Sequence, residues 1–279
     1  MSRHLVCLTF DFDAMSGFAA RGLVTATPVS RGEFGAVGAD RILALLQRHS
    51  IRATWFVPGV VIGTYPAICE RVVAAGHEVG HHGWSHIPPA ELSRDKEAED
   101  LGRGNEAIRG LTGAPAQGYR SPSWDLSANS IELLLDQGFA YDSSMMGHDY
   151  MPYRARVGDV VEAEKPMVFG RETCLVEMPI SWSLDDFPHF EFLRTPGAVL
   201  PGLTDARGVL SNWIDDFLYM KQTCDWGVIT YTCHPYVIGR GHRMMMLERL
   251  ILRLLEEGAL FVTMAEAVKE FESRQSARG

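Results

Sequence analysis

Short apolar runs alternate along this chain with longer segments of helical periodicity, and this alternation constrains the fold more than any other feature. About eight runs are compact, rich in β-branched and aromatic residues, and bounded by Gly or Pro. They are LVCLTFDFD, ATWFV, EVGHHG, AQGYRS, FAYDSSM, CLVEMPISW, GVITYTCH and ALFVTM. Apolar side chains at helical spacing occupy residues 39–49, 66–75, 92–111, 127–137, 205–221, 243–257 and 264–273. The alternation predicts an α/β fold with a parallel sheet, closed or partly closed into a barrel.

The length of the chain suits one α/β barrel or two small domains, and a single domain over residues 1–279 is predicted. Two stretches interrupt the alternation: residues 14–38, rich in Gly, Ala, Thr and Ser, and residues 145–172, which carry HDYMPYRARVGD. Connections of this length in compact domains are usually functional loops or subunit contacts. Both are therefore predicted to be loops that shape the pocket, and their apolar residues favour a homo-oligomer.

The net charge of −9 and the isoelectric point near 5.6 exclude some classes of partner. An acidic chain has no basic field to attract nucleic acid or an anionic membrane, so neither is expected. The first residues lack the features of a secretory signal, and no apolar run approaches the ~20 residues of a membrane-spanning helix. We therefore expect a cytoplasmic protein that acts on a small molecule or a saccharide.

Two aspartates end the first apolar run, in the segment Thr9-Phe10-Asp11-Phe12-Asp13. The two-residue period of a strand places Asp11 and Asp13 on the same face. Two carboxylates that are buried together are costly without a cation, and a divalent metal ion is the simplest partner. The alternative is a solvated acidic strand end.

Three histidines follow the third apolar run, in Gly80-His81-His82-Gly83-Trp84-Ser85-His86. His82 and His86 are four residues apart, the spacing that brings two imidazoles to one face of a helical turn. With Asp13 they would form a set of three protein ligands that leaves a position open, as in catalytic zinc sites. HxxxH alone is a weak signal. His81 points the other way along the strand, so we expect it in the core or behind the ligands.

Two further segments place polar residues where an apolar run gives way to a loop. In Gly118-Tyr119-Arg120-Ser121-Pro122, Arg120 can pair with a carboxylate and hold it deprotonated and oriented. In Thr232-Cys233-His234-Pro235-Tyr236, His234 is placed where an imidazole can donate a proton to a leaving nitrogen. Taken alone, Arg120 would be a surface arginine and His234 a satisfied core histidine.

The segments TFDFD, HGWSH, YRSPSW, YDSS and TCHP occur in the order of the motifs of the polysaccharide deacetylase (NodB-homology) family, which the chain resembles over nearly its whole length. It looks most like the intracellular branch, with Helicobacter-type peptidoglycan deacetylases, cyclic imidases and, more distantly, allantoinase-like hydrolases. The resemblance implies a distorted, TIM-like (β/α) barrel of about seven strands. It also implies one divalent cation, for which Zn²⁺ is expected and Co²⁺, Ni²⁺ or Fe²⁺ would also suit. Relatives in this branch form tetramers.

The resemblance further implies roles for the residues of the first two motifs. The first aspartate of the family motif is the general base and corresponds to Asp11, although here Phe12 separates the two acids. The family's metal ligands correspond to Asp13, His82 and His86. A hydrolase that attacks carbon–nitrogen bonds other than peptide bonds is therefore expected.

The later motifs supply the other catalytic groups that the resemblance implies. The family arginine that braces the base corresponds to Arg120, and the general acid corresponds to His234. The aspartate of the family's fourth motif, which assists the catalytic histidine, corresponds to Asp142. The segment from Trp182 to Pro188 could add polar contacts or could be only an acidic turn before proline.

The substrate remains open between two enzymatic hypotheses. The family name implies N-deacetylation of an N-acetylated amino sugar, but peptidoglycan and chitin lie outside the cytoplasm. Hydrolysis of a cyclic imide or ureide is the alternative, and an enclosed pocket would suit such a compact substrate. The residues expected to line the pocket are Trp84, Trp124, Trp182, Phe187 and Tyr236. A catalytically silent metal- or sugar-binding module is a third hypothesis, but it would have no need of the acid and base groups.

Overall fold

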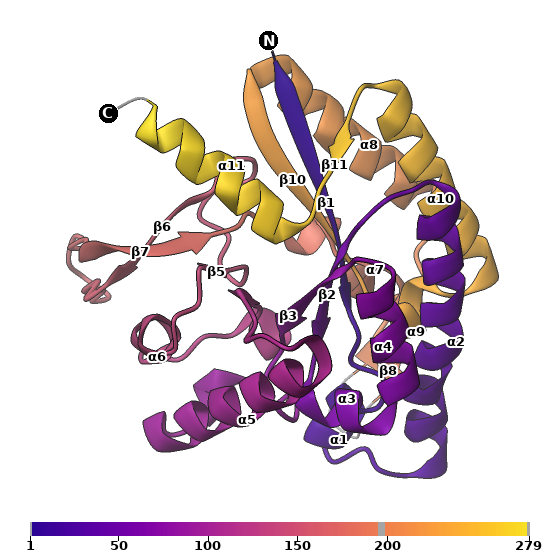
Figure 1. Ribbon diagram of the computed structural model, residues 1–279, viewed down its shortest axis with the longest axis horizontal. Helices are drawn as coiled ribbons and strands as arrows, with labels where there is room; N and C mark the ends of the chain where they lie inside the picture. The colour runs from indigo at the N-terminus through magenta and orange to yellow at the C-terminus, as the bar shows by residue number, and fades with distance from the viewer. Residues whose placement is uncertain (1, 195–198, 278–279) are drawn as a thin grey trace.

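The computed structural model describes residues 2–194 and 199–277, and its main feature is a curled sheet of nine strands (Figure 1). The strands are β1 (Arg3–Asp11), β2 (Thr54–Val57), β3 (Glu78–His81), β4 (Gly118–Tyr119), β5 (Tyr141–Asp142), β6 (Tyr153–Val157), β7 (Arg171–Glu177), β10 (Trp226–Cys233) and β11 (Leu260–Phe261). Seven of them, in the order β10-β1-β2-β3-β4-β5-β7, are parallel, which confirms the predicted α/β fold with a distorted barrel of about seven strands.

The barrel is closed unevenly at its two ends. At the carboxyl ends of the strands, Asp185, which follows β7, makes an isolated parallel bridge to Thr232 of β10. On one side of β1, the first half of the strand pairs in parallel with β11 and the second half pairs with β2. At the far edge of the sheet, β6 pairs antiparallel with β7. β8 (Leu193–Arg194) and β9 (Val199–Leu200) form a separate two-stranded sheet. The carboxyl ends of the strands, which carry the residues of the predicted chemistry, therefore meet at the closed end of the barrel.

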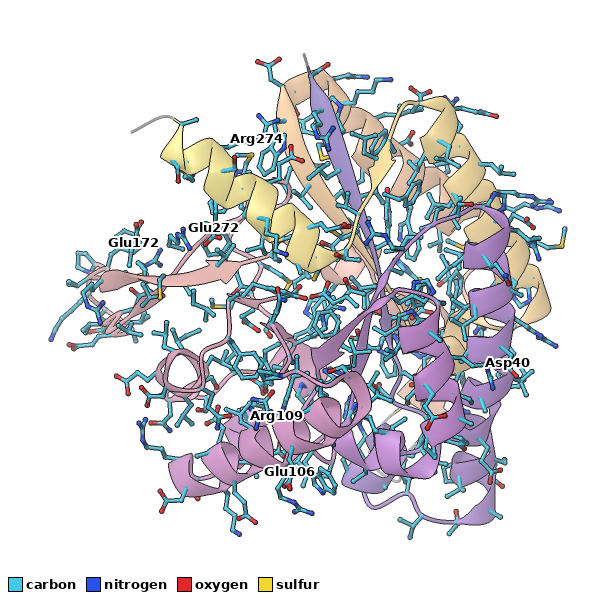
Figure 2. All side chains as sticks on the ribbon, viewed as in Figure 1. Asp40, Glu106, Arg109, Glu172, Glu272 and Arg274 are labelled. Carbon is cyan, nitrogen blue, oxygen red and sulfur yellow. The ribbon has the colours of Figure 1, made fainter. Side chains whose placement is uncertain are left out.

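Helices cover the outside of the sheet, where α8, α10, α2, α4 and α5 follow one another as neighbours (Figure 1). The helices are α1 (Ser16–Ala20), α2 (Ala26–Arg48), α3 (Gly59–Thr64), α4 (Pro66–Ala74), α5 (Arg94–Thr112), α6 (Ser130–Asp136), α7 (Asp186–Phe190), α8 (Ala206–Thr223), α9 (Pro235–Ile238), α10 (Gly241–Glu256) and α11 (Met264–Ser276). Three short 3₁₀ turns span Pro89–Glu91, Pro122–Trp124 and Trp182–Leu184. Charged side chains such as Glu106 and Arg109 lie on the exposed side of α5 (Figure 2). No described helix is both long and apolar enough to cross a membrane.

The two faces of β1 have different partners because its side chains alternate. Val6, Leu8 and Phe10 belong to the large apolar core against the outer helices. Leu5 and Cys7 point inward, where they pack in a second cluster with residues of α11, including Met264 and Phe271. The same inward face continues with Thr9 and Asp11, so α11 fills the lower half of the barrel and leaves its upper half to polar groups.

The expectation that residues 14–38 form a loop is wrong for most of the stretch, because α2 already begins at Ala26. The first half of α2 contains glycines in place of large apolar residues because other segments of the chain pack closely against it. A Cβ on Gly32 would lie 2.5 Å from the Met15 Cα, and a Cβ on Gly38 would lie 1.9 Å from the Pro235 carbonyl oxygen. The glycines therefore allow α2 to approach the loop after β1 and α9, and tertiary packing outweighs their poor helix propensity.

Residues 145–172 were also expected to form a loop, but they contain β6, which forms an antiparallel hairpin with β7. The Tyr153–Val157 segment shows no strict apolar alternation, since only Ala155 is buried and the other four residues are half-exposed. An edge strand with one buried position gives little signal at the level of sequence.

Replacing Gly38 with alanine is expected to lower the free energy of unfolding by about 1–3 kcal/mol, because α2 and α9 must move apart to admit the methyl group. Urea denaturation of the wild type and the variant measures this change. Gly110→Ala on α5 is the matched control, since a Cβ there meets no atom within 4 Å, and alanine is the better helix former. Equal losses of stability in the two variants would contradict the packing argument.

Candidate active site

The first group of polar residues lies around Asp13, two residues beyond the inward-facing end of β1. Asp13 is buried, with a relative exposure of 4%. Its Oδ1 lies 3.4 Å from Nε2 of His82, and its Oδ2 lies 3.2 Å from Nε2 of His86. One ligand atom from each of the three residues lies within 4.8 Å of the other two. The structure thus brings together the three residues that the sequence predicts as metal ligands.

The two histidines reach Asp13 from a loop, so the expected helical turn is wrong. β3 ends at His81, and the chain then turns through positive φ angles of 69° at Gly83 and 62° at His86. The His82 Nδ1 lies 2.7 Å from the Arg120 carbonyl oxygen. A carbonyl oxygen only accepts, so Nδ1 donates this bond and Nε2 stays free to bind a cation.

The donor set fits a divalent metal ion. Two imidazole nitrogens and one carboxylate are the ligands of many catalytic zinc sites. Oδ1 of Asp13 is buried and has no hydrogen-bond partner among the described residues, although it lies close to an imidazole. Burial opposes ionisation of Asp13, but His86 and His82 outweigh it and hold its pKa well below the usual value. Burial likewise opposes charging of His82, but Asp13 and Asp11 raise its pKa.

His81 lies in the core, as the sequence suggests. It is fully buried, its Nε2 lies 3.0 Å from the Leu101 carbonyl oxygen, and its Nδ1 accepts a bond from the Gly83 backbone. Burial lowers the pKa of His81 to about 4, so it is neutral at physiological pH. A Cβ on Gly104 would lie 2.2 Å from the His81 ring, and this glycine therefore makes room for the imidazole under α5.

Arg120 follows β4 and holds Asp11 at the floor of the site. Its Nη1 donates bonds to Oδ1 of Asp11 at 2.7 Å and to Oγ1 of Thr9 at 2.8 Å. Its Nε and Nη2 donate to the carbonyl and hydroxyl oxygens of Ser143. The guanidinium and the carboxylate are both fully buried, so each compensates the charge of the other. Oδ2 of Asp11 faces the metal-ligand cluster, 3.9 Å from Nε2 of His82.

His234 enters the site from the end of β10, opposite Asp11. Its Nδ1 lies 2.8 Å from Oδ1 of Asp186, and its backbone N–H donates to the same carboxylate at 3.0 Å. The carboxylate fixes the ring so that Nε2 points toward the cluster, 3.7 Å from Oδ2 of Asp13. Burial opposes protonation of His234, but Asp185 and Asp186 outweigh it and raise its pKa well above the usual value. Burial in turn raises the pKa of Asp185 to about 8.

The structure does not bring Asp142 to His234, so the expectation that it assists this histidine must be corrected. Asp142 ends β5 and accepts a bond from the Ser144 hydroxyl at 2.7 Å. It is paired with Glu177 of β7, and burial raises the pKa of both, that of Asp142 to about 6. Glu177 in turn accepts bonds from the backbone N–H groups of Ser144 and Met145. The pair holds the turn that contacts Arg120. The acids next to Nδ1 of His234 are Asp186, at 2.8 Å, and Asp185, at 3.5 Å.

A small cavity of about 110 Å³ is lined by Asp11, Asp13, His82, His86, Asp185 and His234. Trp124 and Trp182 form one wall, with ring centroids 4.1 Å apart in a stacked arrangement, and Phe187 and Tyr236 also line the cavity. Arg21 of the loop after α1 was not predicted and reaches the same cavity. Trp84 does not line it, because its ring packs against Gly59 and beneath the guanidinium of Arg103.

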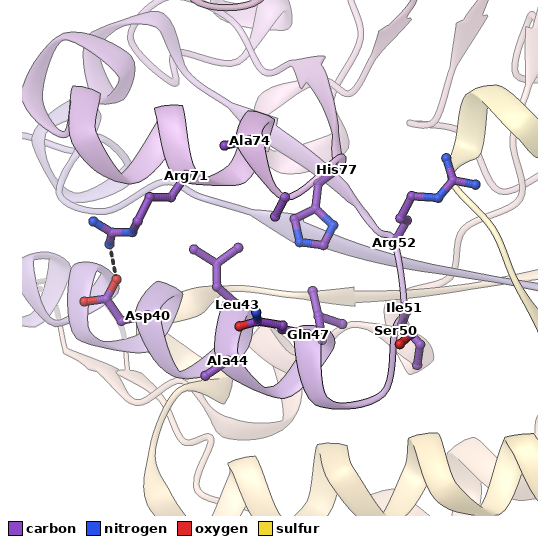
Figure 3. Close-up of a pocket in the computed structure, with 12 residues that line it drawn as sticks. Asp40, Leu43, Ala44, Gln47, Ser50, Ile51, Arg52, Arg71, Ala74 and His77 are labelled. Carbon is purple, nitrogen blue, oxygen red and sulfur yellow. Dashed lines mark hydrogen bonds and ion pairs between the residues drawn. The ribbon is translucent and has the colours of Figure 1, made fainter.

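A larger cleft of about 900 Å³ lies between α2 and α4, but it is a poor candidate for catalysis (Figure 3). It opens beside Ser50–Arg52 and His77, which precede β2 and β3 and so lie at the opposite ends of the strands from the cluster. Its charged residues include an ion pair between Asp40 and Arg71. In α/β barrels the carboxyl ends of the strands carry the chemistry.

Comparison with known proteins connects this arrangement to a family. Residues 2–141 match the family model described as polysaccharide deacetylase. The chain is 37% identical over 285 residues to the peptidoglycan deacetylase of Helicobacter pylori, covering 97% of each protein. Its structure resembles a putative polysaccharide deacetylase from Mycobacterium smegmatis with a TM-score of 0.82 and 28% identity, covering 98% of this chain and 92% of the other.

A second solved structure shares the fold alone. The Puue allantoinase superposes with a TM-score of 0.77 at 19% identity, covering 98% of this chain and 91% of the other. The extent of the family match and the identity to the Helicobacter protein are sufficient to assign the chain to a family. This chain is a hydrolase that belongs to the polysaccharide deacetylase family.

Proposed function

We propose that the protein is a metal-dependent deacetylase that removes the acetyl group from an N-acetylated amino sugar. The observation that carries the proposal is that two differently braced groups, Asp11 held by Arg120 and His234 held by Asp186, converge on one cluster of metal-ligand residues. The similarity to the Helicobacter peptidoglycan deacetylase supports an amino-sugar substrate.

Asp13, His82 and His86 would hold the metal ion, and Zn²⁺ is the ion that we propose. When bound, a divalent cation lowers the pKa of coordinated water and polarises an amide carbonyl. Two histidines and one carboxylate leave a coordination position open for this chemistry. The carbonyl of Arg120 would keep His82 in the tautomer that presents Nε2 to the ion.

Asp11 and His234 would act as the base and the acid on opposite sides of the substrate amide. Oδ1 of Asp11 is occupied by Arg120, so the free Oδ2 removes the proton of the attacking water. Asp186 favours the protonated form of His234, whose Nε2 then donates its proton to the leaving nitrogen. The amine departs, and acetate remains as the second product.

Hydrolysis of a cyclic imide or ureide is the second candidate function. The small volume of the cavity, about 110 Å³, and its stacked wall of Trp124 and Trp182 favour a compact planar substrate. The same acid and base would open the ring, since the bond that breaks is again a carbonyl–nitrogen bond. The two functions therefore differ in the substrate and not in the catalytic groups.

The test is to assay purified, metal-quantified protein against N-acetylglucosamine oligomers and cyclic imides together. We expect acetate release from the acetylated sugars at a rate that far exceeds ring opening of the imides. Ring opening without acetate release would replace the first function with the second. If neither product formed, both substrate proposals would be wrong.

Asp186→Asn is expected to move the basic limb of the kcat/KM profile to lower pH. The wild-type carboxylate raises the pKa of His234, so its removal lets the imidazole lose its catalytic proton at a lower pH. A pH–rate profile of each variant measures the shift. Asp142→Asn should leave this limb in place, because Asp142 contacts Ser144 and Glu177 and does not contact His234. A shift in the second variant alone would reverse the two assignments.

We also propose a cytoplasmic homo-oligomer built from single-domain chains. Exposed apolar side chains on the β6–β7 hairpin support self-association, since Val161 is 73% and Phe169 is 68% exposed. Sedimentation equilibrium would measure the oligomeric state.

A further inference from the structure

A second cleft, of about 490 Å³, lies beside the catalytic cavity, and its lining includes three arginines and one carboxylate, Glu191. The arginines are Arg31 of α2, Arg240 just before α10, and Arg243 in the first turn of α10. Tyr236 lines both this cleft and the catalytic cavity, so one ring separates the two spaces. The concentration of positive charge is unexpected in a chain whose net charge is −9.

Arg243 carries a buried charge that makes no ion pair with any described residue, although Asp186 and Glu191 lie near enough to favour its charged form. The residue is only 7% exposed. Its Nη1 and Nη2 donate to the carbonyl oxygens of Val237 and Phe190, and its Nε is buried without a partner in the described part of the chain. No described carboxylate lies within ion-pairing distance of its guanidinium. A buried guanidinium whose hydrogen-bond acceptors are all neutral is stabilised further when an anion joins it.

Arg240 adds to this excess of charge. Its guanidinium lies 3.5 Å from the centroid of the Phe34 ring, and no ion pair links it to any described carboxylate. Burial and the nearby Arg31 lower the pKa of Arg240, and Glu191, which acts in the opposite direction, does not offset them. Arg31 is the one cleft arginine with an ion pair among the described residues, and its partner is Glu191. Residues 195–198, outside the described part, are Thr-Pro-Gly-Ala and carry no carboxylate.

The N-terminus of α10 adds partial positive charge to that of the arginines. The helix spans 16 residues, its first turn contains no acidic residue, and no side chain caps its N-terminus. The first backbone N–H groups of a helix lack partners within it, and the helix dipole places partial positive charge there. Backbone and side chains thus offer donors to one ligand, and that ligand must be an anion.

We propose that this cleft binds a phosphate-type oxyanion through Arg240, Arg243 and Arg31, with the first turn of α10 as an additional donor. Guanidinium groups recognise such oxygens through paired N–H donors. The anion neutralises the buried charge of Arg243 and relieves the repulsion between Arg31 and Arg240. The oxyanion lies next to the catalytic cavity, on the other side of Tyr236.

The oxyanion could come from the substrate itself or from free phosphate, and kinetics separate the two sources. This comparison rests on the proposed deacetylase function. If the group belongs to the substrate, Arg240→Gln raises the KM of N-acetylglucosamine 6-phosphate about tenfold more than that of N-acetylglucosamine. If free phosphate is the ligand, added phosphate changes the wild-type kcat for both compounds alike. Either result supports the cleft as an oxyanion site.

The site itself is tested by calorimetric titration of inorganic phosphate into the metal-loaded protein at low ionic strength. We expect one phosphate per chain in the cleft, with the affinity reduced at least tenfold in Arg240→Gln. Arg109→Gln is the matched control, because Arg109 is exposed on α5 (Figure 2) and does not line the cleft. Arg243→Gln should also lose phosphate, and its thermal melt shows whether that buried variant folds.

Phosphate can also bind a catalytic metal ion, so the titration is repeated with His82→Gln, which removes a proposed ligand. Retention of phosphate binding in this variant locates the anion in the cleft. The proposal is overturned if phosphate binding disappears in His82→Gln, or if Arg240→Gln binds phosphate as tightly as the wild type. Absence of turnover on both sugars would count against the deacetylase function alone, because the titration does not depend on catalysis.

Discussion

Asp11→Asn is expected to lower kcat about 1,000-fold while the protein keeps its metal ion, a loss of about 4 kcal/mol in transition-state stabilisation. The substitution preserves the shape of the side chain and an oxygen that can accept the bond from Arg120. It removes the charge and the basicity of the Oδ2 position that faces the cluster. Steady-state kinetics with metal analysis of each preparation measures the effect.

Asp215→Asn is the control for this experiment, because Asp215 lies on the exposed side of α8 and should tolerate the change. Arg120 loses its buried counter-charge in Asp11→Asn, so a thermal melt must show that the variant is folded at the assay temperature. Turnover near the wild-type rate, with the metal still bound, would show that Asp11 is not the base.

His82→Gln is expected to weaken metal binding at least about 100-fold and to reduce turnover to the background rate, since a catalytic site with three protein ligands cannot lose one without losing the ion. His82 is also held by the carbonyl of Arg120, so glutamine cannot present a nitrogen at the same point. Equilibrium dialysis against a metal buffer and an acetate-release assay measure the two effects separately.

His49→Gln provides the comparison, because His49 directly follows α2 and its Nε2 lies 3.1 Å from Oε1 of Glu248, with no contact to the cluster. It should keep both the metal and the activity. A His82→Gln protein that binds metal as the wild type does would remove His82 from the ligand set, even if the activity were lost.

The elements with strong periodic signals were predictable from the sequence. The first apolar run and GVITYTCH became β1 and β10, which pair along nearly their whole length, and the helical segments near 92–111 and 205–221 became α5 and α8. Residues 26–38 were not predictable as a helix, because their glycines reflect contacts with Met15 and Pro235 that only the folded chain reveals. β6 was missed because a half-exposed edge strand has no clear apolar alternation.

The candidate site was predictable where residues belong to short motifs and was not where they meet only in space. Asp11, Asp13, His82, His86, Arg120 and His234 were all identified and lie together. The partner of His234 was assigned to Asp142, because YDSS lies in a recognisable motif, but the bridge between Asp185 and Thr232 brings Asp186 there instead. An acidic pair before Phe-Pro looks like an ordinary turn until that bridge is known.

The four-residue spacing correctly identified His82 and His86 as a pair that shares one target, but the expected helical turn is absent. His82 and His86 share one target because the loop turns at Gly83 and His86 itself adopts a positive φ angle, and no helix is involved. For the same reason Trp84, expected to line the pocket, turns away toward Arg103. Loop conformations of this kind depend on tertiary contacts that the spacing of residues does not encode.

The most direct test of a metal-dependent deacetylase is to titrate the metal-free protein with Zn²⁺ while acetate release from N-acetylglucosamine oligomers is followed. We expect no acetate without metal and a linear rise in rate that ends at one ion per chain. A metal-free protein that releases acetate at the full rate, or a rate that is independent of added metal, would contradict this expectation.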